Sequence, residues 1–120
     1  MNAMRTLSQL PTQTAVLVGE LELTRRRIRR ALKKRERYRY VEPEVLIVDG
    51  ALQIASPCCS RNVDPAGGVI DIARIEKLGA IWSLYSREHE AGQWLLHDEY
   101  ADLDVLLQVL CADPARVFWP

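Results

Sequence analysis

Cysteine and histidine are the residue types in this 120-residue chain that could hold a metal ion. Cys58 and Cys59 are adjacent in sequence, and the histidines are His89 and His97. Structural zinc sites use cysteine pairs spaced by two to four residues, whereas adjacent cysteines point their side chains apart. A bridge between neighbouring cysteines is strained, and the total of 3 cysteines is odd, which argues against a disulfide framework. We therefore predict no metal site, no cofactor and no disulfide framework.

Nucleophilic catalysis is the second chemistry that these residue types could support. A cysteine activated by a histidine, with Asp98 orienting the ring, would form such a site if the three side chains met in space. Any chain of this length offers that combination by chance, so the sequence favours a protein that is not an enzyme. Gly67-Gly68 lacks both the lysine and the strand-to-helix context of a phosphate-binding loop and is interpreted as a turn. No catalytic residue is assigned.

Charge is the stronger signal, although the formal net charge is zero. Residues 1–40 carry 11 Lys and Arg against 3 Asp and Glu, or +8, and residues 41–120 carry 5 against 13, or −8. Ten cations fall within residues 25–39, which is more than a solvated helix face requires. The candidate binding residues in this segment are Arg26, Arg29, Arg30, Lys33 and Arg37.

Three interpretations of the basic segment stay open. It could contact an acidic protein surface, including that of a second copy, or bind nucleic acid through residues 25–39 with Tyr38 and Tyr40 stacking on bases. It could also be only a soluble face. The protein contact is favoured because the −8 remainder is untypical of nucleic-acid-binding domains.

Membrane association is not expected. The apolar stripe of the basic segment lacks Trp or Phe for insertion, and no apolar run approaches the roughly 18 residues of a membrane-spanning helix. The first residues lack the apolar stretch of a secretory signal, so a cytoplasmic location is expected.

Apolar spacing predicts a long N-terminal basic helix from Thr14 to Arg39. The apolar stripe is narrow, and basic side chains are expected to fill the rest of the circumference. Residues 15–23 are rich in β-branched side chains and include Gly19, so a strand is also possible there. Residues 1–12 are polar and are expected to be disordered. The stripe consists of Leu17, Leu21, Ile28 and Leu32.

Strand periodicity begins after residue 40. Asp49-Gly50 separates two β-branched runs, Glu44–Val48 and Ala51–Ala55, and predicts a two-residue hairpin turn. Asp102 is expected to cap a short C-terminal helix. Three further strands are predicted at Val69–Ile75, Ile81–Tyr85 and Gln93–His97, with Trp82, Tyr85 and Trp94 in cross-strand pairs and Phe118-Trp119 in the core.

These elements define one α+β domain over residues 1–120. Consecutive strands joined by short turns pair antiparallel, which predicts a sheet of four or five strands. The long N-terminal helix and the short C-terminal helix are expected to cover one face of that sheet.

The C-terminal third resembles a known family. Its marks are the strand Trp82-Ser83-Leu84-Tyr85, the strand Gln93–His97, a leucine-rich helix, and the ending Asp113-Pro114 to Phe118-Trp119. Over residues 75–120 these features are similar to the bacterial family catalogued as domain of unknown function 3024. Pro120 departs from the family, which prefers glycine there. The resemblance implies a shared architecture, and because the family has no established activity it implies no catalytic residue.

Overall fold

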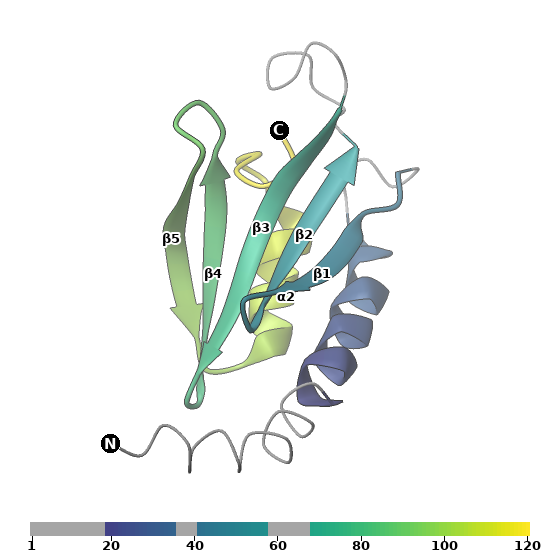
Figure 1. Ribbon diagram of the computed structural model, residues 1–120, viewed down its shortest axis with the longest axis vertical. Helices are drawn as coiled ribbons and strands as arrows, with labels where there is room; N and C mark the ends of the chain where they lie inside the picture. Colours follow the sequence, from purple (N-terminus) through teal and green to yellow (C-terminus); the bar gives the residue numbers. More distant parts are fainter. Residues whose placement is uncertain (1–18, 36–40, 58–67) are drawn as a thin grey trace, which may run out of the picture.

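The computed structural model describes residues 19–35, 41–57 and 68–120. Within that part the N-terminal helix runs from residue 19 to residue 32, and it is followed by five strands and a second helix. The strands are β1 Glu44–Val48, β2 Ala51–Pro57, β3 Val69–Leu78, β4 Ile81–Glu88 and β5 Gln93–Tyr100, and the second helix is α2 Leu103–Ala112. The α+β class and the order of its elements are confirmed (Figure 1).

The five strands form one antiparallel meander in the order β1-β2-β3-β4-β5. Asp49 and Gly50 both have positive φ, 52° and 75°, and Val48 pairs with Ala51 across them. This is the geometry of a tight hairpin whose turn matches the twist of its strands, so the predicted hairpin is confirmed.

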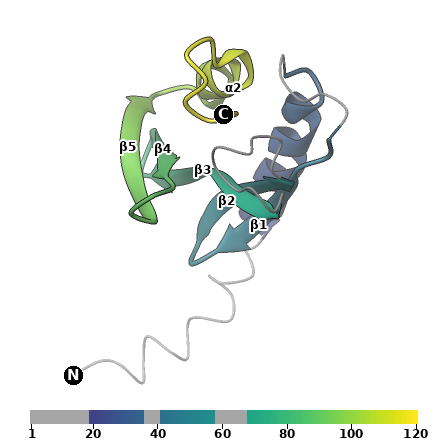
Figure 2. The same cartoon turned by 90° about the horizontal axis from the view of Figure 1, so that it is seen from above.

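The sheet curves around its two helices. Register shifts occur between Ile54 and Ala55 in β2 and between Leu84 and Tyr85 in β4, and such bulges increase local twist and bend a strand. Figure 2 shows the N-terminal helix and α2 in the hollow of the sheet, with no described helix on the outer side. Both helices therefore cover one face, as predicted.

Strands β3, β4 and β5 each end three residues later than the hydrophobic pattern predicts. The strand predicted to end at Tyr85 continues to Glu88, and the one predicted to end at His97 continues to Tyr100. Most of these last positions carry polar or charged side chains, but backbone pairing with the neighbouring strand does not depend on side-chain polarity. The observed loop between β4 and β5 is therefore shorter than the predicted loop, residues 86–92.

The predicted extension of the N-terminal helix to Arg39 is wrong. The helix ends at residue 32, and the N–H groups of Lys34 and Arg35 bond to the carbonyls of Ala31 and Leu32 at 3.0 and 3.2 Å. These i to i+3 bonds tighten and close the last turn. Residues 1–18 and 36–40 lie outside the described residues, so neither the predicted disorder of residues 1–12 nor the start of the helix is tested.

The core lies between the helices and the inner face of the sheet. One face of α2 is buried through its four leucines, and Asp102 caps that helix, as predicted, by accepting a hydrogen bond from the Asp104 N–H at 2.8 Å. Phe118 and Trp119 are each 1% exposed, so both belong to the core. The other large buried side chains include Ile28, Leu32, Val45, Leu52, Ile54, Ile75, Leu84, Leu103, Leu106, Leu107 and Leu110.

The three strand aromatics each face a partner across the sheet, but not one another. Trp82 pairs with Tyr100, Tyr85 with Leu96, and Trp94 with Arg87, whose guanidinium lies 4.8 Å from the indole centroid. The cross-strand placement is therefore as predicted, and the partners are of three different kinds.

Asp113 organises the end of the chain. It follows α2 in the left-handed conformation, with φ of 37°, and is almost fully buried. Its carboxylate accepts hydrogen bonds from the backbone N–H groups of Val117, Phe118 and Trp119 at 2.8, 2.9 and 2.7 Å. One charged group thus satisfies three donors and places the two aromatic side chains in the core.

We expect Asp113→Ala to lower the free energy of unfolding by about 3 kcal/mol, because it leaves three N–H groups without their acceptor. Asp102→Ala, which removes one capping bond, is the matched control and should cost about 1 kcal/mol. Urea denaturation of both variants measures the difference. An Asp113→Ala loss no larger than that of Asp102→Ala would contradict this account of the motif.

Candidate functional site

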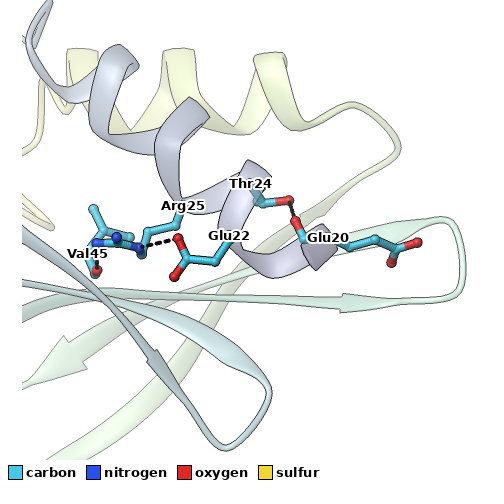
Figure 3. A network of polar contacts seen from close by, with 5 residues as sticks. All are labelled: Glu20, Glu22, Thr24, Arg25 and Val45. Carbon is cyan, nitrogen blue, oxygen red and sulfur yellow. Dashed lines mark hydrogen bonds and ion pairs between the residues drawn. The ribbon is translucent and has the colours of Figure 1, made fainter. Parts of the chain in front are cut away.

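The cations of the N-terminal helix separate into those that hold the fold together and those that face outward. Arg25 belongs to the first group: its Nε donates to Glu22 at 3.3 Å, and its Nη1 donates to the Val45 carbonyl on β1 at 3.4 Å. Figure 3 shows this side chain directed from the helix toward β1, near the separate bond from Thr24 to the Glu20 carbonyl. Arg25 therefore ties the helix to the sheet.

Two further arginines reach carboxylates on other elements. Arg27 lies 2.7 Å from Asp104 at the start of α2, so this pair connects the two helices. Arg29 is 4.0 Å from Glu42, ahead of β1, which is the outer limit of an ion pair. Surface pairs of this kind contribute about 0–1 kcal/mol, so their main effect is to neutralise part of the positive charge.

Arg35 is buried, contrary to the prediction that it lies on the exposed circumference of the helix. It is 2% exposed and donates to the carbonyls of Leu32 at 2.8 Å and of Val41. Its guanidinium lies 4.7 Å from the ring centroid of Trp119. Because the helix has already ended, the side chain turns inward, where the planar guanidinium combines stacking with hydrogen bonding.

Four of the five predicted binding residues lie together on the outward side of the helix. Arg26, Arg29, Arg30 and Lys33, here called the cationic stripe, are all exposed. Spacings of three and four residues place them within about one third of the helix circumference, opposite buried Ile28. Arg26, Arg30 and Lys33 have no ion pair with a carboxylate in the described part of the chain. The fifth predicted residue, Arg37, lies outside the described residues.

An acidic surface lies across the molecule from the stripe. Glu90 in the β4–β5 turn and Asp98 and Glu99 on β5, here called the acidic edge, are exposed. None of the three forms an ion pair with a cation of residues 19–35, 41–57 or 68–120. Figures 1 and 2 show β5 and the N-terminal helix at opposite sides of the sheet. Part of the net negative charge of residues 41–120 therefore lies along β5 and the turn that precedes it.

Burial raises the pKa of Tyr85, and the charge of Glu99 makes a minor contribution to that shift. Partial burial is the largest cause that raises the pKa of the Tyr85 hydroxyl, followed by a hydrogen bond to Glu76 and the charges of Glu76 and Glu99. A carboxylate disfavours formation of a nearby phenolate, so Glu76 and, more weakly, Glu99 add to the effect of burial. The sequence gives no signal for the acidic edge, because strand order decides that Asp98 and Glu99 lie on an edge strand.

Those residues suggesting catalysis that the structure describes are not gathered into one site. The His97 ring packs against Phe118, with centroids 5.0 Å apart, while the Asp98 carboxylate accepts from the Glu99 N–H. Cys111 instead faces the N-terminal helix, where its Sγ lies 3.5 Å from the Ala31 carbonyl. Among the described residues no group of three His, Cys, Asp or Glu side chains could hold a metal ion. Cys58 and Cys59 lie outside them.

A groove between the two helices has a volume of about 650 Å³. Arg30 and Lys34 line one wall, and Gln108 and Cys111 line the other. The one acidic residue in its lining, Asp104, is already paired with Arg27.

Within the described ranges no helix is long and apolar enough to cross a membrane.

Comparison with known proteins gives one match. A family model described as "Domain of unknown function (DUF3024)" matches residues 18–120. The match extends the resemblance seen at residues 75–120 to the basic helix and the first hairpin. No curated protein and no solved structure matches the chain.

Replacement of Arg35 is expected to destabilise the protein rather than alter its surface. Arg35→Leu should cost about 2–3 kcal/mol, because buried carbonyl groups lose their donor and Trp119 loses its stacked cation. Arg26→Leu, on the cationic stripe, should change stability by less than about 0.5 kcal/mol. Thermal and urea unfolding measure both. Equal effects of the two substitutions would refute the structural role of Arg35.

Cys111 is expected to be a poor nucleophile. Burial raises the pKa of its thiol, and the nearby charge of Arg35 only partly opposes that effect. Because the thiolate is the reactive form, alkylation at about pH 8 should be several-fold slower in the folded protein than in urea. Peptide mass mapping after a timed iodoacetamide pulse measures the rate at this cysteine. Equal rates in both states would show that the thiol is freely accessible.

Proposed function

This chain belongs to the DUF3024 family, which is described only as a domain of unknown function, and we propose from its surface that it is a non-enzymatic interaction module. Its cationic stripe binds an acidic protein surface. The observation that carries this proposal is the exposure of Arg26, Arg30 and Lys33 on one helix side, with no described carboxylate as partner.

The fold supports recognition by a preorganised surface. Ile28 and Leu32 are buried beneath the stripe, and Arg25 and Arg27 attach the same helix to β1 and α2. The helix is therefore held from three directions, and its outward side chains keep a constant spacing. The arginine guanidinium is planar and can donate two parallel hydrogen bonds to one carboxylate. This geometry suits a protein surface that carries Asp and Glu.

Nucleic acid fits this surface less well than an acidic protein does. Arg25, Arg27 and Arg35 are engaged within the fold, so the cationic area is smaller than the sequence alone suggests. The acidic edge would repel a long phosphate backbone wherever it approached β5. A protein partner of limited size would contact the stripe without meeting that edge.

The affinity is expected to be modest and sensitive to salt. Exposed ion pairs contribute about 0.2–1 kcal/mol each, so electrostatic contacts at four cations add up to a weak complex. Steering raises the association rate most at low ionic strength. The Debye length is about 10 Å at 0.1 M salt, so the contact should weaken steeply above that concentration.

Binding to a generic acidic polymer tests the proposal. We expect poly-glutamate to bind the full chain at about 20 mM NaCl, with an affinity that falls at least tenfold by about 200 mM. The triple variant Arg26→Glu, Arg30→Glu and Lys33→Glu should abolish binding, because it reverses the charge of the stripe. Fluorescence anisotropy with labelled poly-glutamate measures both affinities.

A charge-matched control separates the stripe from net charge. Lys34→Glu, Lys77→Glu and Arg116→Glu change the same number of exposed cations outside the stripe and should retain most of the binding. Equal losses in the two triple variants would mean that the stripe has no special role. Stronger binding to duplex or single-stranded DNA than to poly-glutamate, lost in the stripe variant, would replace the proposal with nucleic-acid recognition.

A further inference from the structure

We infer that the acidic surface bound by the cationic stripe is the acidic edge of a second copy of this chain. This inference rests on the proposed function, since it names the partner of the same stripe. The contact places Arg26, Arg30 and Lys33 of one copy against Asp98 and Glu99 of the next.

β5 has the properties of a strand that is incomplete by itself. It is the last strand of the sheet and pairs only with β4, so its outer edge has no neighbour among the described strands. Leu95 and Leu96 are 46% and 53% exposed, so two adjacent apolar side chains of this edge strand lie in water. A partner that covers this edge would remove both leucines from water.

The charges and apolar groups of the two surfaces are complementary. The stripe continues toward the helix start with Leu23, which is 66% exposed. From Arg26 to Lys33 the helix rises by about 10 Å, and from Leu95 to Glu99 the strand extends by about 13 Å. Leu23 can therefore approach Leu95 and Leu96 while the cations face carboxylates.

Asp98 and Glu99 flank the free edge of β5 on both faces. Asp98 pairs across the sheet with Leu84, whose side chain is in the core, and Glu99 pairs with Ser83 on the adjacent position. Successive residues of a strand point to opposite faces, so the two carboxylates lie on either side of the edge. A helix laid along the edge can contact both of them.

Two carboxylates on the outer face of the sheet are already paired within the same copy. On the outer face of the sheet Arg74 lies 3.1 Å from Glu76, and Arg87 lies 3.6 Å from Asp71. These acids are neutralised within the same copy. The acidic edge keeps its charge for a partner, and the net charge of zero means that two copies do not repel each other overall.

The contact is head to tail, because the stripe and the acidic edge lie at opposite sides of one copy. Such a heterologous contact leaves a free stripe and a free edge on the pair, so further copies can add or close a ring. The assembly should therefore grow with concentration instead of stopping at a dimer by symmetry.

Sedimentation velocity of the full chain tests the inference. At about 20 mM NaCl we expect the weight-average mass to rise with concentration above the monomer value of 13.7 kDa. At about 500 mM NaCl it should return to that value. The stripe variant (Arg26→Glu, Arg30→Glu, Lys33→Glu) and an edge variant (Asp98→Lys, Glu99→Lys) should each be monomeric at low salt.

Mixing the two variants gives the decisive result. The cationic stripe of the edge variant and the unaltered acidic edge of the stripe variant can still form the original contact. We therefore expect the mixture to associate although neither variant does so alone. Far-ultraviolet circular dichroism of each variant confirms folding. A control variant, Glu20→Lys and Glu44→Lys, reverses two exposed carboxylates outside the acidic edge and should self-associate like the unaltered chain.

The results distinguish failure of this inference from failure of the proposed function. A chain that is monomeric at all salt concentrations but binds poly-glutamate through the stripe overturns the inference and leaves the proposed function intact. Self-association that survives reversal of the stripe also overturns the inference. If the unaltered chain neither binds poly-glutamate nor self-associates, both the proposed function and this inference are overturned.

Discussion

The guanidinium of Arg35, stacked on the indole of Trp119, is the contact on which the arrangement of this protein depends. It joins the end of the N-terminal helix to the last residues of the chain, and both partners are buried. Asp113 fixes the position of Trp119 by accepting its backbone N–H, and the indole N–H donates to the Leu110 carbonyl at 2.9 Å. A buried cation is costly unless it is hydrogen-bonded, so this contact requires the helix end, α2 and the C-terminal turn to be in place together.

That contact also determines how the positive charge is distributed. With the end of the helix held at Arg35, Ile28 and Leu32 face the core, and Arg25 and Arg27 are directed to β1 and α2. The remaining cations must then point away from the sheet. The cationic stripe is consequently a product of packing on the opposite side of the helix, and the distance of β5 from that helix keeps the two charge groups from neutralising each other.

Local signals in the sequence predicted the elements well where each signal is complete within a few residues. Asp49-Gly50 supplies the positive φ that a tight hairpin needs, and Asp102 supplies the oxygen that the first turn of α2 needs. Helix and strand ends were less accurate. β4 and β5 continue through charged residues because a pairing partner satisfies their backbone, and the N-terminal helix stops at residue 32 although residues 33–35 are compatible with a helix.

The sequence by itself determined the α+β class, the order of the elements and the first hairpin, because each follows from periodicity or turn chemistry over short distances along the chain. Tertiary structure decided which cations remain on the surface and where the acidic residues gather. Arg35 could be assigned to the core only when Trp119, 84 residues later, was seen beneath it. Asp98 and Glu99 lie at a free edge only because β5 is the last strand of the sheet, since strand order and exposure depend on contacts distant in sequence.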